Sequence, residues 1–276
     1  MKKKIIDILL TVLLLFLMAY QVTGEVLHEW LGIAMTVLLI LHHILNRKWY
    51  SSLFKGKYNA YRALTVCINT LLLAAIALTA FCGMSMSGYA VPFFYGMASV
   101  SFARRFHLAM SHWSFVLMGL HLGLHIPAML SKWKPSNKAR VILSVIFTCI
   151  SGYGLHIFLR SGMTDYMFFR NAFAFLDYDK AKWLVILENL LMLIFWAFIG
   201  TQLANLCRSK ANKQNPLLPV VFILLSVVIG LACGQLIHEP KQDAFSGNRM
   251  ERSIAPIAKL TDVSYRLDAN EIDRNE

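Results

Sequence analysis

The chain has 276 residues, of which 57% are hydrophobic and only 15% are charged, and its formal net charge is +12. Soluble domains are rarely this apolar, and this chain repeats uncharged runs of about 18 or more residues, each able to cross a bilayer core of roughly 30 Å. A membrane β-barrel would need short alternating strands, which the sequence does not show. The composition therefore excludes an ordinary soluble domain and predicts a bundle of membrane helices.

Seven apolar segments are long enough to be membrane spans. In chain order they are residues 5–22, 25–46, 63–84, 104–130, 139–159, 183–206 and 217–237. We therefore expect an all-α polytopic transmembrane bundle of about seven spans in residues 1–237. Residues 238–276 are polar and poor in aromatic residues, which predicts an extracytoplasmic tail.

The basic residues are divided unevenly between the two sides of this bundle. The side of the N-terminus carries Lys2, Lys3, Lys4, Arg47, Lys48, Lys55, Lys57, Arg62, Lys132, Lys134, Lys138, Arg140, Arg208, Lys210 and Lys213. The opposite loops carry only Arg104, Arg105, Arg160, Arg170, Lys180 and Lys182. Because Lys and Arg concentrate in cytoplasmic loops, this asymmetry predicts a cytoplasmic N-terminus and an extracytoplasmic C-terminus. The topology of a chain in membrane lipid thus explains the excess of positive charge. We therefore expect no nucleic-acid partner.

Two segments on the predicted outer side, 85–103 and 161–182, are rich in aromatic residues. Aromatic side chains gather at the membrane–water interface, so an aromatic belt explains both segments. The alternative is a surface that caps a cofactor or docks a partner. The sequence leaves both interpretations open.

Seven of the nine histidines fall in the second and fourth predicted spans. The second span contains His28, His42 and His43, and the fourth contains His107, His112, His121 and His125. Imidazole is costly in hydrocarbon, so such a concentration indicates a functional site.

The same spacing occurs in both spans. His28 and His42 are 14 residues apart, as are His107 and His121. Fourteen helical residues rise about 21 Å and return to within about 40° of the same face. Both spans run from outside to inside, so one pair lies near each membrane surface. Two facing pairs at two depths are what two bis-histidine b haems need.

Other histidines leave alternatives open. His125 lies one turn beyond His121 and is an alternative inner ligand, or a partner for a propionate or a quinone. His43 lies one residue off the face of His42 and is the less favoured alternative. His112 matches the spacing poorly.

Residues beside the histidines also fit a cofactor. Arg104 and Arg105 directly precede the histidines of the fourth span, where guanidinium groups would suit haem propionates or lipid headgroups. Gly32, Gly119 and Gly123 would leave room for a flat macrocycle, although close helix packing uses the same residue type. The five cysteines form no CxxCH motif, so we do not expect a c-type haem.

Three stretches resemble a known bacterial family. They are TGEVLHEWLGIAMTVLLILHHILNRKWY, ARRFHLAMSHWSFVLMGLHLGLH and SGYGLHIFLRSGMTDYMFFRNAFAFLDYDKAKW. Their motifs HEWLG, LHHILN-x-KW, FHLA and LHLGLH together resemble the flavinylation-associated transmembrane cytochrome family, a cytochrome b-like domain of unknown function. The resemblance covers roughly the first six spans and implies roles for His28, His42, His43, His107, His121 and His125. His112 departs from it, since an aromatic residue is expected there.

The resemblance implies a multi-pass protein of the bacterial cytoplasmic membrane that passes electrons through b haems to FMN-binding partners. We therefore expect a di-haem b-type cytochrome that transfers electrons from the quinone pool to an extracytoplasmic flavoprotein or another redox carrier. It would serve as the electron-transfer component of a quinol-dependent oxidoreductase. The chain carries no recognisable flavinylation motif or FMN domain, so any flavin belongs to the partner. The alternatives are a transition-metal transporter or sensor, and a membrane anchor subunit of a redox complex.

Overall fold

A computed structural model of the chain describes residues 2–133, 136–212 and 217–236, so the predicted tail at 238–276 lies outside the described residues. The described residues form helices and turns without a strand, which confirms the all-α class. In chain order the elements are α1 (Lys2–Met18), α2 (Tyr20–Leu45), α3 (Lys48–Ser52), α4 (Ala60–Met86), the 3-10 helix η1 (Pro92–Phe94), α5 (Val100–Trp133), α6 (Asn137–Arg160), α7 (Met163–Met167), α8 (Lys182–Asn212) and α9 (Leu217–Leu236).

Five of the described helices are long and apolar enough to cross a membrane, which makes this a multi-pass membrane protein by length and composition. These stretches are Tyr20–Leu45, Ala60–Met86, Lys138–Arg160, Lys182–Arg208 and Leu217–Leu236. The predicted first and fourth spans correspond to α1, which has 17 residues, and α5, whose four histidines lower its mean hydropathy. Seven spans and the orientation of the termini therefore stay predictions.

The boundary between the first two predicted spans is wrong by several residues. The first helix ends at Met18, and α2 begins at Tyr20 where a loop at residues 23–24 was expected. Ala19, at the break, is apolar and fully buried, so the hydropathy of the sequence does not reveal the turn. Gly24 then interrupts α2 with a φ of 68° and a ψ of 178°, a conformation that glycine tolerates far better than other residues.

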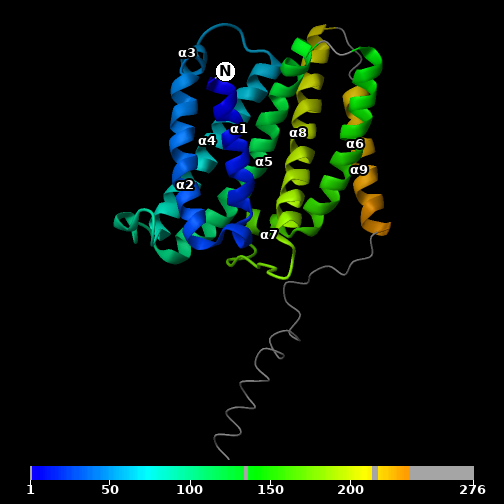
Figure 1. The fold of residues 1–276 in the computed structure, drawn as a ribbon. Coiled ribbons are helices and arrows are strands. Elements are labelled where there is room, and N and C mark those ends of the chain that lie inside the picture. Colours follow the sequence, from blue (N-terminus) through cyan, green and yellow to red (C-terminus); the bar gives the residue numbers. More distant parts are fainter. Residues whose placement is uncertain (1, 134–135, 213–216, 237–276) are drawn as a thin grey trace, which may run out of the picture. The chain divides into compact units, whose positions relative to one another are not determined.

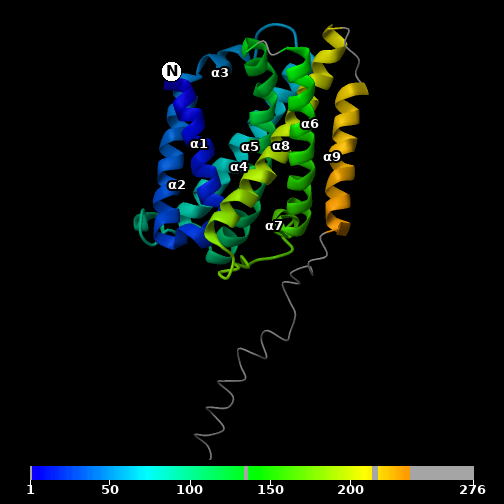
Figure 2. The same ribbon diagram turned by 45° about the vertical axis from the view of Figure 1, so that its right-hand side comes forward.

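The long helices lie side by side (Figures 1 and 2). α1 packs on α2, α4 on α5, α5 on α8, and α6 on both α8 and α9. The start of α1 and helix α3 lie at one end of the bundle, and α7 lies at the other (Figure 1). Among the described residues, no Cα atom of α2 lies within 8 Å of a Cα atom of α5. The two histidine-bearing helices therefore make no close backbone contact with each other.

Small residues allow α5 and α8 to approach each other closely. A Cβ atom on Gly123 of α5 would overlap the carbonyl oxygen of Ala197 on α8, and one on Gly119 would lie 2.5 Å from the Cβ atom of Trp196. These two glycines therefore serve helix packing, which corrects their interpretation as space for a macrocycle. A Cβ atom on Gly32 would meet nothing within 4 Å.

We expect the Gly123→Val variant to be less stable than the wild-type protein, because its side chain would collide with the backbone of α8. Overpacking of this kind costs about 1–3 kcal/mol. Gly32→Ala is the matched control and should be neutral or stabilising, since its methyl group enters open space and Ala favours a helix over Gly. Thermal unfolding in detergent, followed by circular dichroism, measures both variants. Equal melting temperatures would contradict this packing role.

Candidate functional site

The two histidines predicted to form the outer pair meet in the structure. His28 on α2 and His107 on α5 have ring centroids 6.0 Å apart, with an angle of 72° between the ring planes. Because the backbones of α2 and α5 stay apart, the two imidazoles occupy the space between the helices from opposite sides. Sequence spacing and tertiary placement thus agree for this pair.

Helix α4 determines how the ring of His107 is oriented. The backbone carbonyl of Thr79 lies 3.0 Å from Nδ1 of His107. A carbonyl oxygen can only accept, so Nδ1 carries the proton and Nε2 keeps its lone pair. Gly83, one turn further along α4, makes room for the ring, since a Cβ atom there would lie 3.1 Å from Cε1 of His107. The ring of His107 is therefore held in one orientation and one tautomer.

The imidazole of His28, the other member of the pair, has fewer hydrogen bonds than that of His107. Its Nδ1 atom is buried and has no hydrogen-bond partner among the described residues. The ring of Tyr20 lies edge-on to it, with the centroids 5.1 Å apart. A buried polar atom without a partner costs free energy, so this nitrogen marks a position where a ligand or a cofactor would complete the site.

The histidines of the predicted inner pair each bind an oxygen atom of a different neighbouring helix. Nδ1 of His121 lies 2.8 Å from Oδ1 of Asn69 on α4. Nδ1 of His42 lies 2.9 Å from a carboxylate oxygen of Asp7 on α1. Both bonds leave Nε2 of the imidazole available. Among the described residues no ring contact joins His42 to His121, so the inner pair is more open than the outer one.

The two alternative inner ligands lie beside this pair. His43 contacts the ring of His42, with centroids 5.6 Å apart, and its Nδ1 atom lies 2.6 Å from the hydroxyl of Tyr50. His125 is exposed, and its ring lies 4.9 Å from that of His121. Both residues are therefore near the inner site, and the choice between them and the predicted ligands stays a prediction.

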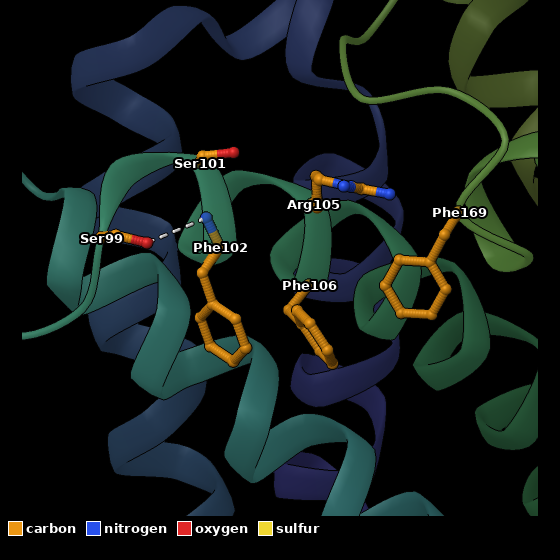
Figure 3. A pocket seen from close by; sticks show the side chains of 6 residues that line it. All are labelled: Ser99, Ser101, Phe102, Arg105, Phe106 and Phe169. Carbon is orange, nitrogen blue, oxygen red and sulfur yellow. Dashed lines mark hydrogen bonds between the residues drawn. The ribbon is translucent and has the colours of Figure 1, made fainter.

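Arg104 and Arg105, predicted as partners of a propionate, lie elsewhere. The guanidinium of Arg104 stacks over the ring of Phe173 at 5.0 Å. Arg105 is exposed and lines a shallow hollow of about 470 Å³ together with Ser99, Ser101, Phe102, Phe106 and Phe169 (Figure 3). In Figure 3 its side chain extends towards Phe169. No contact of either arginine with the outer histidine pair is found among the described residues, so their assignment to a propionate stays a prediction.

The segment 161–182 packs against the first half of α5, while its interpretation as a cap or a docking surface stays a prediction. The ring of Tyr166 stacks on that of His112, with centroids 4.9 Å apart and planes 26° apart. Nε1 of Trp113 donates to the carbonyl of Met167 at 3.1 Å. Burial raises the pKa of the Tyr166 phenol, and its oxygen accepts a hydrogen bond from the backbone N–H of Phe175. Nδ1 of His112 donates to the carbonyl of Leu108 on its own helix at 2.6 Å.

Asp7, Asn69 and Thr79 have no motif of their own in the sequence, and the motif HEWLG does not show what its Glu29 binds. Asp7 and Asn69 accept from histidines of the inner pair, Thr79 accepts from the outer pair, and Glu29 binds a neighbouring turn. For Asp7, Asn69 and Glu29 the available signal was a polar residue within an apolar helix, which usually has a functional or structural partner. Such a residue indicates that a partner exists but not which one. Thr79 accepts through its backbone carbonyl, for which the sequence gives no signal.

The set of contacts suits a metal held by imidazole nitrogens. Histidines that bind metals almost always donate their other ring N–H to a carboxylate or a carbonyl. Three of the four predicted ligands do so, namely His42, His107 and His121. No group of three or more His, Cys, Asp or Glu residues that could hold a metal ion occurs in the described part of the chain, while a bis-histidine haem needs only two.

Comparison with known proteins found no match among protein-family models, curated proteins or solved structures. The site is therefore interpreted from the sequence pattern and from the geometry given above.

The tautomers of the buried histidines provide a direct check of this geometry. We expect His107 and His121 to carry their proton on Nδ1, because the atoms facing them are acceptors. Nitrogen-15 NMR of histidine-labelled protein reports the tautomer of each ring. Replacing Asn69 with Leu should release His121 alone and leave His107 unchanged. A proton on Nε2 of His107 in the wild-type protein, without bound metal, would contradict the contact with Thr79.

Proposed function

We propose that this protein transfers electrons through the membrane with two b haems. His28 and His107 would hold the outer haem, and His42 and His121 the inner one. The observation that carries the proposal is the orientation of the rings: three of these four histidines use Nδ1 for an oxygen on another helix and keep Nε2 for iron. Histidines that bind metals commonly have this arrangement, in which one ring nitrogen donates a hydrogen bond and the other binds the metal.

The separation between the rings of His28 and His107 also fits a metal bound by two imidazoles. Two imidazoles that bind one metal from opposite sides, at metal–nitrogen distances of about 2 Å, have centroids about 6 Å apart. The centroids of His28 and His107 are 6.0 Å apart. The absence of close backbone contact between α2 and α5 also favours a bound group between these helices.

The chain's own residues would bind and orient the group and exclude water from it. Thr79 and Asn69 fix the rings on α5, and Asp7 fixes the ring of His42 on α2. Haem iron, when bound, would supply reversible one-electron oxidation and reduction. If two histidines held each haem iron, no site would stay open for oxygen, which favours electron transfer over oxygen activation.

We further propose seven spans, with the N-terminus in the cytoplasm of a bacterium and the C-terminus outside its cell membrane. The positive-inside pattern supports this orientation. A quinol would donate the electrons, and an extracytoplasmic flavoprotein or another redox carrier would accept them near the outer pair. These partners follow from the family resemblance of the sequence, and the chain would act as the electron-transfer component of a quinol-dependent oxidoreductase.

The haem content of the purified protein tests the proposal. We expect two b haems per chain by the pyridine haemochrome assay, and one in the His107→Ala variant, because that change removes an axial ligand of the outer haem only. His112→Ala is the matched control on the same helix, since His112 binds its own backbone. It should keep both haems.

Protein that contains no haem, despite ample haem during expression, would overturn the proposal. Binding of a transition metal by such protein would then favour the transporter or sensor. Loss of haem in His112→Ala but not in His107→Ala would overturn the assignment of the ligands.

Asp7 offers a second test through the inner haem. A carboxylate that accepts from a ligand imidazole increases its basicity and so stabilises the oxidised metal. Asp7→Asn should therefore raise the midpoint potential of one haem, by several tens of millivolts, and leave the other unchanged. Potentiometric titration followed by absorption spectroscopy measures both. Equal shifts of both potentials would contradict a contact confined to the inner site.

A further inference from the structure

Glu29, the residue after the first predicted ligand, binds a turn that lies outside its own helix. Its Oε2 atom accepts from the hydroxyl of Ser87 at 2.7 Å and from the backbone N–H groups of Tyr89 at 2.9 Å and Ala90 at 2.8 Å. Its Oε1 atom accepts from the N–H of Gly88 at 3.0 Å. One carboxylate therefore receives four hydrogen bonds from four consecutive residues.

This turn is the direct continuation of α4. Ser87 is the first residue after that helix, and it is buried. The same helix holds the ring of His107, through the carbonyl of Thr79 and the space left by Gly83. Helix α4 thus positions one histidine of the outer pair, and Glu29 ties the helix of the other histidine to α4.

The tie matters because α2 makes no close backbone contact with α5, the helix that carries the other histidine of the pair. The backbones of α2 and α5 stay more than 8 Å apart at every Cα pair of the described residues. Helix α2 is largely exposed here. Leu27 and Trp30, which flank His28 and Glu29 in the sequence, are each about half exposed. Hydrogen bonds to a charged group are roughly twice as strong as those between neutral groups. Four of them give α2 a defined distance from α4.

We propose that Glu29 is a positioning residue for the outer histidine pair: its carboxylate binds the turn after α4 and thereby fixes the separation of His28 from His107. The geometric part of this role is independent of any cofactor. Its consequence for haem binding rests on the proposed function.

The test compares full-length variants in detergent. Glu29→Gln keeps the size of the side chain but leaves one acceptor oxygen in place of two. Glu25→Gln is the matched control, because it removes the same charge one turn earlier on an exposed position of the same helix. Ser87→Ala removes one donor from the other side and is the milder variant if Glu29→Gln does not fold. Glu29→Asp keeps the carboxylate and should restore part of the effect.

Two measurements report the result. Modification by diethyl pyrocarbonate, read by mass spectrometry, gives the reactivity of each histidine, and hydrogen exchange gives the protection of the amides of residues 88–90. We expect Glu29→Gln to increase the reactivity of His28 and His107 about tenfold, since it weakens hydrogen bonds to a charged group, and to leave His121 unchanged. Ser87→Ala should give a smaller increase in the same two residues, and Glu25→Gln none.

Three outcomes would overturn the proposal. Unchanged reactivity of His28 and His107 in Glu29→Gln, with faster exchange at 88–90, would show that Glu29 holds only the turn. An equal increase at His121 would show general loosening of the bundle. The same increase in Glu25→Gln would show an effect of charge alone.

Electron paramagnetic resonance of the haem-bearing protein tests whether Glu29 also affects haem binding. The signal of one low-spin haem should shift or broaden in Glu29→Gln while the other stays unchanged, and a spectrum identical to that of the wild-type protein would overturn the role in haem positioning. Wild-type protein without haem would instead contradict the proposed function, and the reactivity of the histidines would still decide the role of Glu29.

Discussion

The structure depends on one constraint: a polar imidazole inside an apolar bundle costs free energy unless it finds a hydrogen-bond partner within the protein, because hydrocarbon offers none. His107 finds the carbonyl of Thr79, His121 finds the amide of Asn69, and His42 finds the carboxylate of Asp7. Each of these bonds joins two helices. The hydrogen bonds of these histidines therefore also link neighbouring helices, α5 to α4 and α2 to α1.

This constraint explains why α2 and α5 can face each other without backbone contact. Helix α4 supports the rings of α5, and α1 supports α2 at the inner end through Asp7. At the outer end the corresponding support for α2 is Glu29, which binds the turn after α4. Each end of the space between the histidine helices thus has its own acidic residue, one on α1 and one on α2. The two histidine pairs are thus held by different elements.

Much of the fold follows from hydropathy and spacing. Each predicted span overlaps one long helix, because a run of apolar residues that must bury its backbone polar groups forms a helix. The outer pair of histidines also meets as its 14-residue spacing indicates. The break at Ala19 escaped prediction because a buried apolar residue interrupts no hydrophobic pattern. Gly119 and Gly123 were equally compatible with a cofactor and with helix packing, since both need a residue without a side chain.

The sequence by itself determined the class of the protein, the approximate positions of its long helices and the relative faces of the histidines within each helix, because hydropathy and helical periodicity are local properties. Only the tertiary structure decided which atom each imidazole binds, that Arg104 stacks on Phe173, and that Glu29 reaches the turn at 87–90. These contacts join residues far apart in the chain. They depend on which helices pack together, and periodicity within a single helix does not specify its neighbours.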